Sequence, residues 1–150
     1  MKTTEELYKV IWMSRPLMQA AEALVEQGLS DTGLTVRTRA VLEVVLQHGS
    51  LSVPDIAHHL FIKRQYVQVM VNETLAGGLS CKLANPRHKS SPLIALTDKG
   101  SALIRDVMSG EQKIIENLSA DFDPAQVSAT LEVTSALVRK LMAHTDGNGT

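Results

Sequence analysis

Apolar side chains recur every three or four residues along most of the chain, which is the spacing of amphipathic α-helices. The first such segment begins near Thr3, where Thr3 and Glu6 form a capping-box pattern, and it ends at a Gly-rich break over residues 28–33. Further helices are expected over residues 35–47, 53–60 and 64–76 and from Thr97 onward, followed by a last helix with Asp123 as N-cap, Pro124 as first residue and Gln126 as capping-box partner.

The helices over residues 53–60 and 64–76 are separated by a very short connection, Phe61-Ile62-Lys63. Two helices joined by so tight a turn predict a helix-turn-helix. After Gly77-Gly78 the period changes, and residues 79–84 and 93–96 are short segments suited to strands. They flank the turn-rich, basic stretch 85–92, which predicts a hairpin with a long tip, or wing. The expected fold class is mainly α with a small β-hairpin wing.

Composition narrows the class of protein. A chain of 150 residues, of which 44% are hydrophobic, is of single-domain size and can bury a core. Its apolar runs, such as residues 44–46, are far too short to span a membrane, and no signal peptide is visible. Cys81 is the single cysteine, so it cannot form an intrachain disulfide. A soluble cytoplasmic protein is therefore expected.

Charge is distributed unevenly along the chain. The net charge is −1, yet residues 60–92 carry Lys63, Arg64, Lys82, Arg87 and Lys89 against the single acid Glu73, which leaves +4 on this segment and −5 on the rest. A basic patch on an otherwise acidic chain favours a module that meets an anion on one face. A solvated basic surface is the alternative interpretation of the charge alone.

The helix over residues 64–76 has an apolar face for packing and a polar face for recognition. Gln65, Gln68 and Asn72 share the polar face at spacings of three and four. In the major groove, amide side chains can pair with adenine and arginine with guanine, while a basic wing reaches phosphates or the minor groove. An ordinary solvated face beside a basic loop is the alternative. The predicted DNA-binding residues are Lys63, Arg64, Gln65, Tyr66, Gln68, Asn72, Arg87, His88 and Lys89.

The segment from Leu34 to Gly100 resembles the winged helix-turn-helix core of the MarR family of bacterial transcription regulators. The most specific similarities are the Leu34-Thr35 start, the Ile56-Ala57 pair, residues 75–79 before the wing and the sequence Leu96-Thr97-Asp-Lys-Gly100 after it. Two positions depart from the family pattern. His88-Lys89-Ser90 replaces an Asp-x-Arg pattern at the wing tip, and Lys63 replaces the Ser or Thr that often caps the recognition helix.

The resemblance implies an obligate homodimer that reads a pseudo-palindromic operator, with half-sites roughly 10–10.5 bp apart. It also implies that dimerisation and DNA binding belong to different segments of one intertwined domain. Residues 1–33 would form an N-terminal dimerisation helix, residues 34–97 the DNA-binding lobe, residues 98–144 the C-terminal dimerisation helices and residues 145–150 a flexible tail.

Residues able to do other chemistry are scattered. His58 and His59 are adjacent on a short helix and diverge by about 100°, so we expect no metal site, no cofactor and no enzymatic activity. Cys81 is expected to be a buried structural thiol. In the resembling family, small anionic aromatics bind between the dimer helices and the DNA-binding lobe. By that resemblance the ligand-binding candidates are Trp12, Arg15, Met18, Arg37 and Arg39; alternatively, Trp12 is dimer core and the arginines are solvated or touch phosphate.

The sequence therefore predicts a sequence-specific, DNA-binding transcription regulator, in the form of a homodimeric repressor relieved by a small aromatic or anionic effector. The alternative is a winged-helix module that docks protein and has no specific DNA binding. The net charge of −1 and the missing acid–arginine pair of the wing favour that alternative, whereas the basic patch and the amide-rich helix face count against it.

Overall fold

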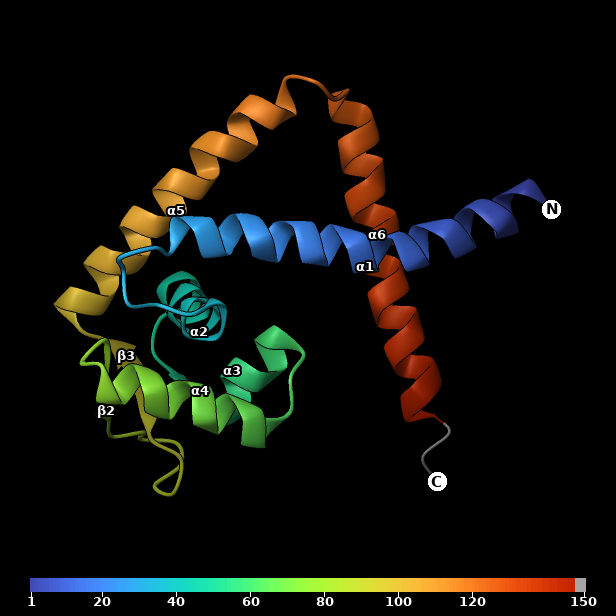
Figure 1. Ribbon diagram of the computed structural model, residues 1–150. Helices are drawn as coiled ribbons and strands as arrows, with labels where there is room; N and C mark the ends of the chain where they lie inside the picture. The colour runs from blue at the N-terminus through green and yellow to red at the C-terminus, as the bar shows by residue number, and fades with distance from the viewer. Residues whose placement is uncertain (148–150) are drawn as a thin grey trace. The chain divides into compact units, whose positions relative to one another are not determined.

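The structure is a computed structural model that describes residues 1–147 (Figure 1). Over these residues the chain forms helices and a small three-stranded antiparallel sheet, which confirms the predicted fold class. The elements in chain order are α1 (Lys2–Gly28), α2 (Val36–His48), β1 (Leu51–Ser52), α3 (Val53–Leu60), α4 (Arg64–Ala76), β2 (Ser80–Leu83), β3 (Leu93–Leu96), α5 (Asp98–Ser119) and α6 (Pro124–Asp146).

The chain divides into two compact units, Met1–Glu111 and Gln112–Thr150. The boundary falls inside α5, so residues 98–111 of this helix belong to the unit that contains the helix-turn-helix. No helix among residues 1–147 combines the length and the apolar character needed to cross a membrane.

The helix starts follow from local hydrogen bonding in most places. Thr35 caps α2 in a reciprocal capping box with Thr38, and Ser52 caps α3 by accepting from the Asp55 backbone N–H. The capping box predicted at Thr3 and Glu6 is wrong, because the N-cap of α1 is Met1, two residues before Thr3. Thr3 is therefore inside the helix, where its side chain cannot cap, and Glu6 lies 3.9 Å from the Lys2 ammonium instead.

The sheet has the strand order β1-β3-β2. The predicted hairpin is confirmed: β2 and β3 pair from Ser80 opposite Leu96 to Leu83 opposite Leu93. The third strand, β1, was not predicted. It consists of two residues, which pair with Ile94 and Leu93 of β3. Two residues are too few to show the alternation of apolar and polar side chains that predicts a strand. They form a strand only because they pair with the hairpin beside them.

Two apolar clusters form the core of the first unit. One joins α2, α3, α4 and β3 around Val41, Ile56, Val67 and Ile94. The other joins the end of α1, α2, the start of β2 and α5 around Leu29, Leu42, Leu79 and Ile104. The helix-turn-helix and the wing are thus held on one side of α2, and the loop between β2 and β3 projects from this lobe past α4 (Figure 1).

Much of the apolar surface is left uncovered. No residue of α1 is buried, and the side chains of Tyr8, Trp12 and Leu17 are exposed. In the second unit α6 likewise buries no residue, and Phe122 and Leu131 are exposed. These statements cover residues 1–147. Helices of this length with exposed apolar stripes are not explained by the packing within one chain.

The last helix begins as predicted, with Asp123 as N-cap and Pro124 as first residue. The Asp123 carboxylate accepts from the Ala125 backbone N–H at 3.2 Å, and Gln126 makes no hydrogen bond that completes a capping box among the described residues. The helix continues through Thr145 to Asp146, which were expected to open a flexible tail. Residues 148–150 of that expected tail lie outside the described residues.

Candidate nucleic-acid interface

The turn between α3 and α4 sets the direction of the recognition helix. Phe61 ends α3 in the left-handed conformation, with φ +57°, and the Ile62 backbone N–H donates to the Ala57 carbonyl at 3.1 Å. Lys63 stands at the N-cap of α4 and makes no side-chain capping bond. Val67, Met70, Val71 and Thr74 then bury one face of α4 against the rest of the lobe.

The opposite face of α4 is free, as the sequence pattern predicts. Arg64, Gln65, Gln68 and Asn72 are all exposed on it, and Tyr66 is 61% exposed. The Gln68 Nε2 donates to the Asn72 Oδ1 at 2.9 Å, one helical turn further along. This bond uses one of the two Nε2 hydrogens of Gln68 and leaves the other hydrogen and Oε1 for a further partner.

A polar hollow of about 380 Å³ separates α4 from the wing. Two cations and two amides line it, together with hydroxyl groups from the wing, and no acidic side chain does so in the part of the chain that the structure describes. Its polar lining comes from Arg64, Gln65 and Gln68 of α4, Lys82 of β2, and Ser90 and Ser91 of the wing loop. The hollow therefore suits an anion.

The wing loop is organised by one asparagine. The Asn85 Oδ1 accepts from the Arg87 backbone N–H at 3.0 Å, and its Nδ2 donates to the Ser91 carbonyl at 2.8 Å. The side chain thus bridges the two sides of the loop. Arg87, His88 and Lys89, the three predicted wing residues, are exposed at its tip.

Lys82 is the residue that sequence reasoning missed. The basic patch included it, but no role was assigned to it. The available signal was the alternation of side chains along a strand, which separates Lys82 from its neighbours Cys81 and Leu83. In the structure Lys82 is exposed and lines the same hollow as Arg64, while Cys81 is half-buried rather than buried.

The five ligand candidates divide into two groups. On α1, the Arg15 guanidinium lies 5.6 Å from the centre of the Trp12 ring, and Met18 is exposed on the same helix. On α2, Arg37 pairs with Glu73 of α4 at 3.0 Å and lines a shallow hollow of about 420 Å³ where α1 meets α2. Arg39 instead pairs with Glu43 and with Glu111 of α5, so carboxylates of different helices already engage the two α2 arginines.

The histidines pair in a way that the sequence did not indicate. The ring of His48, the last residue of α2, stacks on that of His59 with 3.9 Å between centroids, while His58 lies 6.0 Å from His59. Among residues 1–147, no three His, Cys, Asp or Glu side chains are grouped so that they could hold a metal ion.

Together the helix-turn-helix, the three-stranded sheet and the exposed wing define a winged helix-turn-helix protein. No family model matches the chain. A solved MarR family transcription regulator is 30% identical, with a TM-score of 0.81, and the match covers 95% of both chains. The chain therefore belongs to the MarR family of transcription regulators and is not an enzyme.

Two more distant proteins are similar over most of the chain. The transcriptional repressor MdtR of Bacillus subtilis is 24% identical over 140 residues, which are 93% of this chain and 90% of the repressor. The Bordetella bronchiseptica protein BpsR, whose DNA binding is regulated by 6-hydroxynicotinic acid, is 22% identical, and the match covers 87% of this chain and 98% of BpsR. Its TM-score of 0.74 shows a shared fold.

Proposed function

We propose that this regulator is a homodimeric repressor that binds a pseudo-palindromic operator through α4 and the wing. The observation that carries the proposal is the exposed amide face of α4 beside an acid-free basic hollow. Arg64, Gln65 and Gln68 would read base edges in the major groove, since their donors and acceptors match guanine and adenine. Asn72 belongs to the same amide face. Lys63, Tyr66, Arg87, His88 and Lys89 would set the position of the lobe on phosphates and in the grooves.

The homodimer is supported by the uncovered apolar surface of both units. In the second unit a largely apolar groove of about 870 Å³ runs between the end of α5 and the start of α6, lined by Ile115, Leu118, Phe122, Val127 and Leu131. A second copy would cover such surfaces, with residues 1–33 and 98–144 in the dimer and residues 34–97 as the DNA-binding lobe. Two lobes related by a two-fold axis would read half-sites about one helical turn apart.

Relief of repression by a small effector is the third part of the proposal. BpsR provides support, because its DNA binding is regulated by an aromatic acid. In this chain Trp12 and Arg15 offer a ring face and a cation one turn apart, which suits a small aromatic or anionic ligand. A repressor acts on chromosomal DNA, so the proposal includes a cytoplasmic location.

The test is fluorescence anisotropy of the full chain with the DNA upstream of its own gene, against random DNA of equal length, at about 50 and about 200 mM salt. A preference for the upstream fragment and a loss of roughly 10³–10⁵ in affinity between the two salts are expected for a dimer that makes 6–10 phosphate contacts. Sedimentation of the same sample should give a dimer. Weak, salt-independent binding without preference would favour the protein-docking alternative and overturn the proposal.

A further inference from the structure

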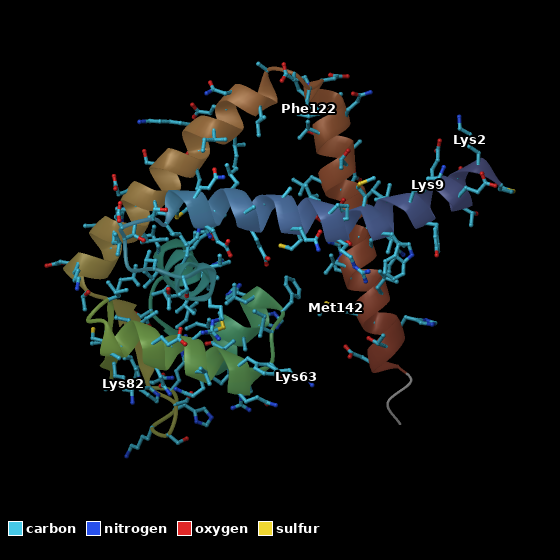
Figure 2. The ribbon with its side chains drawn as sticks, in the orientation of Figure 1. Lys2, Lys9, Lys63, Lys82, Phe122 and Met142 are labelled. Atoms are coloured by element: carbon cyan, nitrogen blue, oxygen red, sulfur yellow. The ribbon has the colours of Figure 1, made fainter. Side chains whose placement is uncertain are left out.

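Lys82 stands apart from the other cations of the lobe. It lies on the stem of the wing, on β2, rather than on α4 or at the wing tip, and its backbone is fixed opposite Ile94 of β3. Figure 2 places Lys63 at the start of α4 and Lys82 on the wing side of the same lobe. Because Lys82 lines the hollow together with Arg64, two cations from two different elements face one space.

The geometry of duplex DNA determines what must pass through that space. A major groove and the minor groove beside it are separated by one sugar–phosphate strand. If α4 lies in the major groove and the wing tip reaches the adjacent minor groove, the strand that separates the grooves must pass between α4 and the wing. The hollow lies between these two elements. Its wing side carries Lys82, Ser90 and Ser91, and its α4 side carries Arg64 and two amides.

We infer that Lys82 binds the phosphodiester of this intervening strand, so that the wing side of the hollow is a backbone-phosphate site beside the base-reading residues of its α4 side. The inference rests on the proposed DNA binding. A lysine ammonium is a compact point charge that suits a phosphate oxygen, whereas base-edge reading favours the planar donors of arginine and the amides. Ser90 and Ser91 add hydroxyl donors on the wing side.

The site has a structural purpose beyond affinity. Lys82 would hold the strand from the wing side while the base-reading residues of α4 lie on its other side, so the distance between α4 and the wing would fix where the grooves lie relative to the lobe. Lys82 would then act on every sequence alike, as a positioning residue, because the phosphate carries no base identity.

The matched variants are Lys82→Ala, Lys82→Arg and the control Lys99→Ala. The control also removes one exposed cation from the same unit. The Lys99 Nζ, however, donates to the Gly77 carbonyl at 3.3 Å, at the opposite end of α4 from Arg64. Loss of one phosphate contact lowers the slope of log K against log salt by about 0.9, and Lys82→Ala removes one contact from each protomer of the proposed dimer. The affinity ratio of wild type to Lys82→Ala should therefore shrink by about 12-fold between about 50 and about 200 mM salt, equally on upstream and random DNA. Lys82→Arg should keep the wild-type slope, and Lys99→Ala should not change it.

A second measurement identifies the phosphate itself. The upstream DNA is prepared with single neutral methylphosphonate linkages scanned along each strand, and binding of wild type and Lys82→Ala is compared. One linkage on the strand between the two grooves should weaken the wild type and cause no further loss in Lys82→Ala. If every linkage weakens both proteins equally, or if Lys82→Ala matches Lys99→Ala, the phosphate site is wrong although DNA binding stands. If wild type shows no salt-dependent binding at all, the proposed function has failed instead.

Discussion

Arg39 of α2 and Glu111 of α5 form a bidentate ion pair. The Arg39 Nε donates to the Glu111 Oε1 at 2.6 Å, a second guanidinium nitrogen donates to Oε2, and the third donates to Glu43 at 2.6 Å. The hydrogen bond with Glu111 is the main cause that raises the pKa of Arg39, against the effect of its burial. The pair joins the DNA-binding lobe to α5 at the last residue of the first unit.

Removing Arg39 should be costly, because it leaves two partly buried carboxylates without a counter-charge. The exposed fractions of the Arg39 and Glu111 side chains are 13% and 18%. We expect Arg39→Ala to lower the free energy of unfolding by roughly 2–4 kcal/mol, and Arg39→Met with Glu111→Met to recover much of that loss. Arg37→Ala breaks the exposed pair with Glu73 and should cost less than about 1 kcal/mol. Urea unfolding measures all three, and equal losses for Arg39→Ala and Arg37→Ala would contradict the assignment.

Gly100 lies where the start of α5 touches the connection between α4 and β2. A Cβ at this position would be 1.9 Å from the Leu79 carbonyl oxygen, so the two segments would have to separate. We expect Gly100→Ala to lower the free energy of unfolding by more than about 3 kcal/mol. Gly110, in the same helix, has no such neighbour within 4 Å. Gly110→Ala should therefore raise the free energy of unfolding by about 0.5–1 kcal/mol. Thermal unfolding of the two variants should therefore shift in opposite directions.

Phe61 holds a backbone conformation that suits glycine better. Its φ is +57° and its side chain is 65% exposed, so replacing it removes strain and little packing. We expect Phe61→Gly to raise the free energy of unfolding by about 1 kcal/mol. Asp31, with φ +65°, is a matched control, because aspartate tolerates this conformation and Asp31→Gly should gain less. A destabilised Phe61→Gly would mean that the Phe61 ring contributes packing in the assembled protein.

The sequence predicts those parts of the fold that local interactions determine. The bounds of α3 and α4 follow from Ser52 as a cap, from Pro54 in the first turn and from the apolar period around Val67. The contacts of Lys82 and the stacking of His48 on His59 depend on elements that meet only after folding. No local sequence pattern predicts contacts between elements that are distant in the sequence. The strand β1 and the ion-pair partners of Arg39 were not predicted for the same reason.

Gln68 should determine preference at one base pair. Its Nε2 donates one hydrogen to Asn72, and its second Nε2 hydrogen and its Oε1 can still pair with a base. We expect Gln68→Ala to cost roughly 1–3 kcal/mol on the preferred site and to relax the preference at a single position. Binding to a panel of single-base variants measures this. An equal loss on preferred and random DNA would refute base reading by Gln68.

Lys89 should contribute charge and no sequence preference. It is exposed at the tip of the loop that Asn85 organises. We expect Lys89→Ala to weaken binding to all sequences alike and to lower the salt slope by about one for each protomer of the dimer. Salt titrations on two unrelated sequences, with Lys99→Ala alongside, test this. A loss confined to one sequence would instead make Lys89 a base reader.

The short strand β1 ties the wing directly to the first helix of the helix-turn-helix. Leu51 and Ser52 pair with the central strand of the sheet, and Ser52 is also the N-cap of α3, so no free residue separates the wing from the helix-turn-helix. A movement of the wing would therefore also move α3, because backbone hydrogen bonds connect the two. The wing and the helix-turn-helix would then move as one body. Two lobes of the proposed dimer would adjust to an operator by a change in the distance between them.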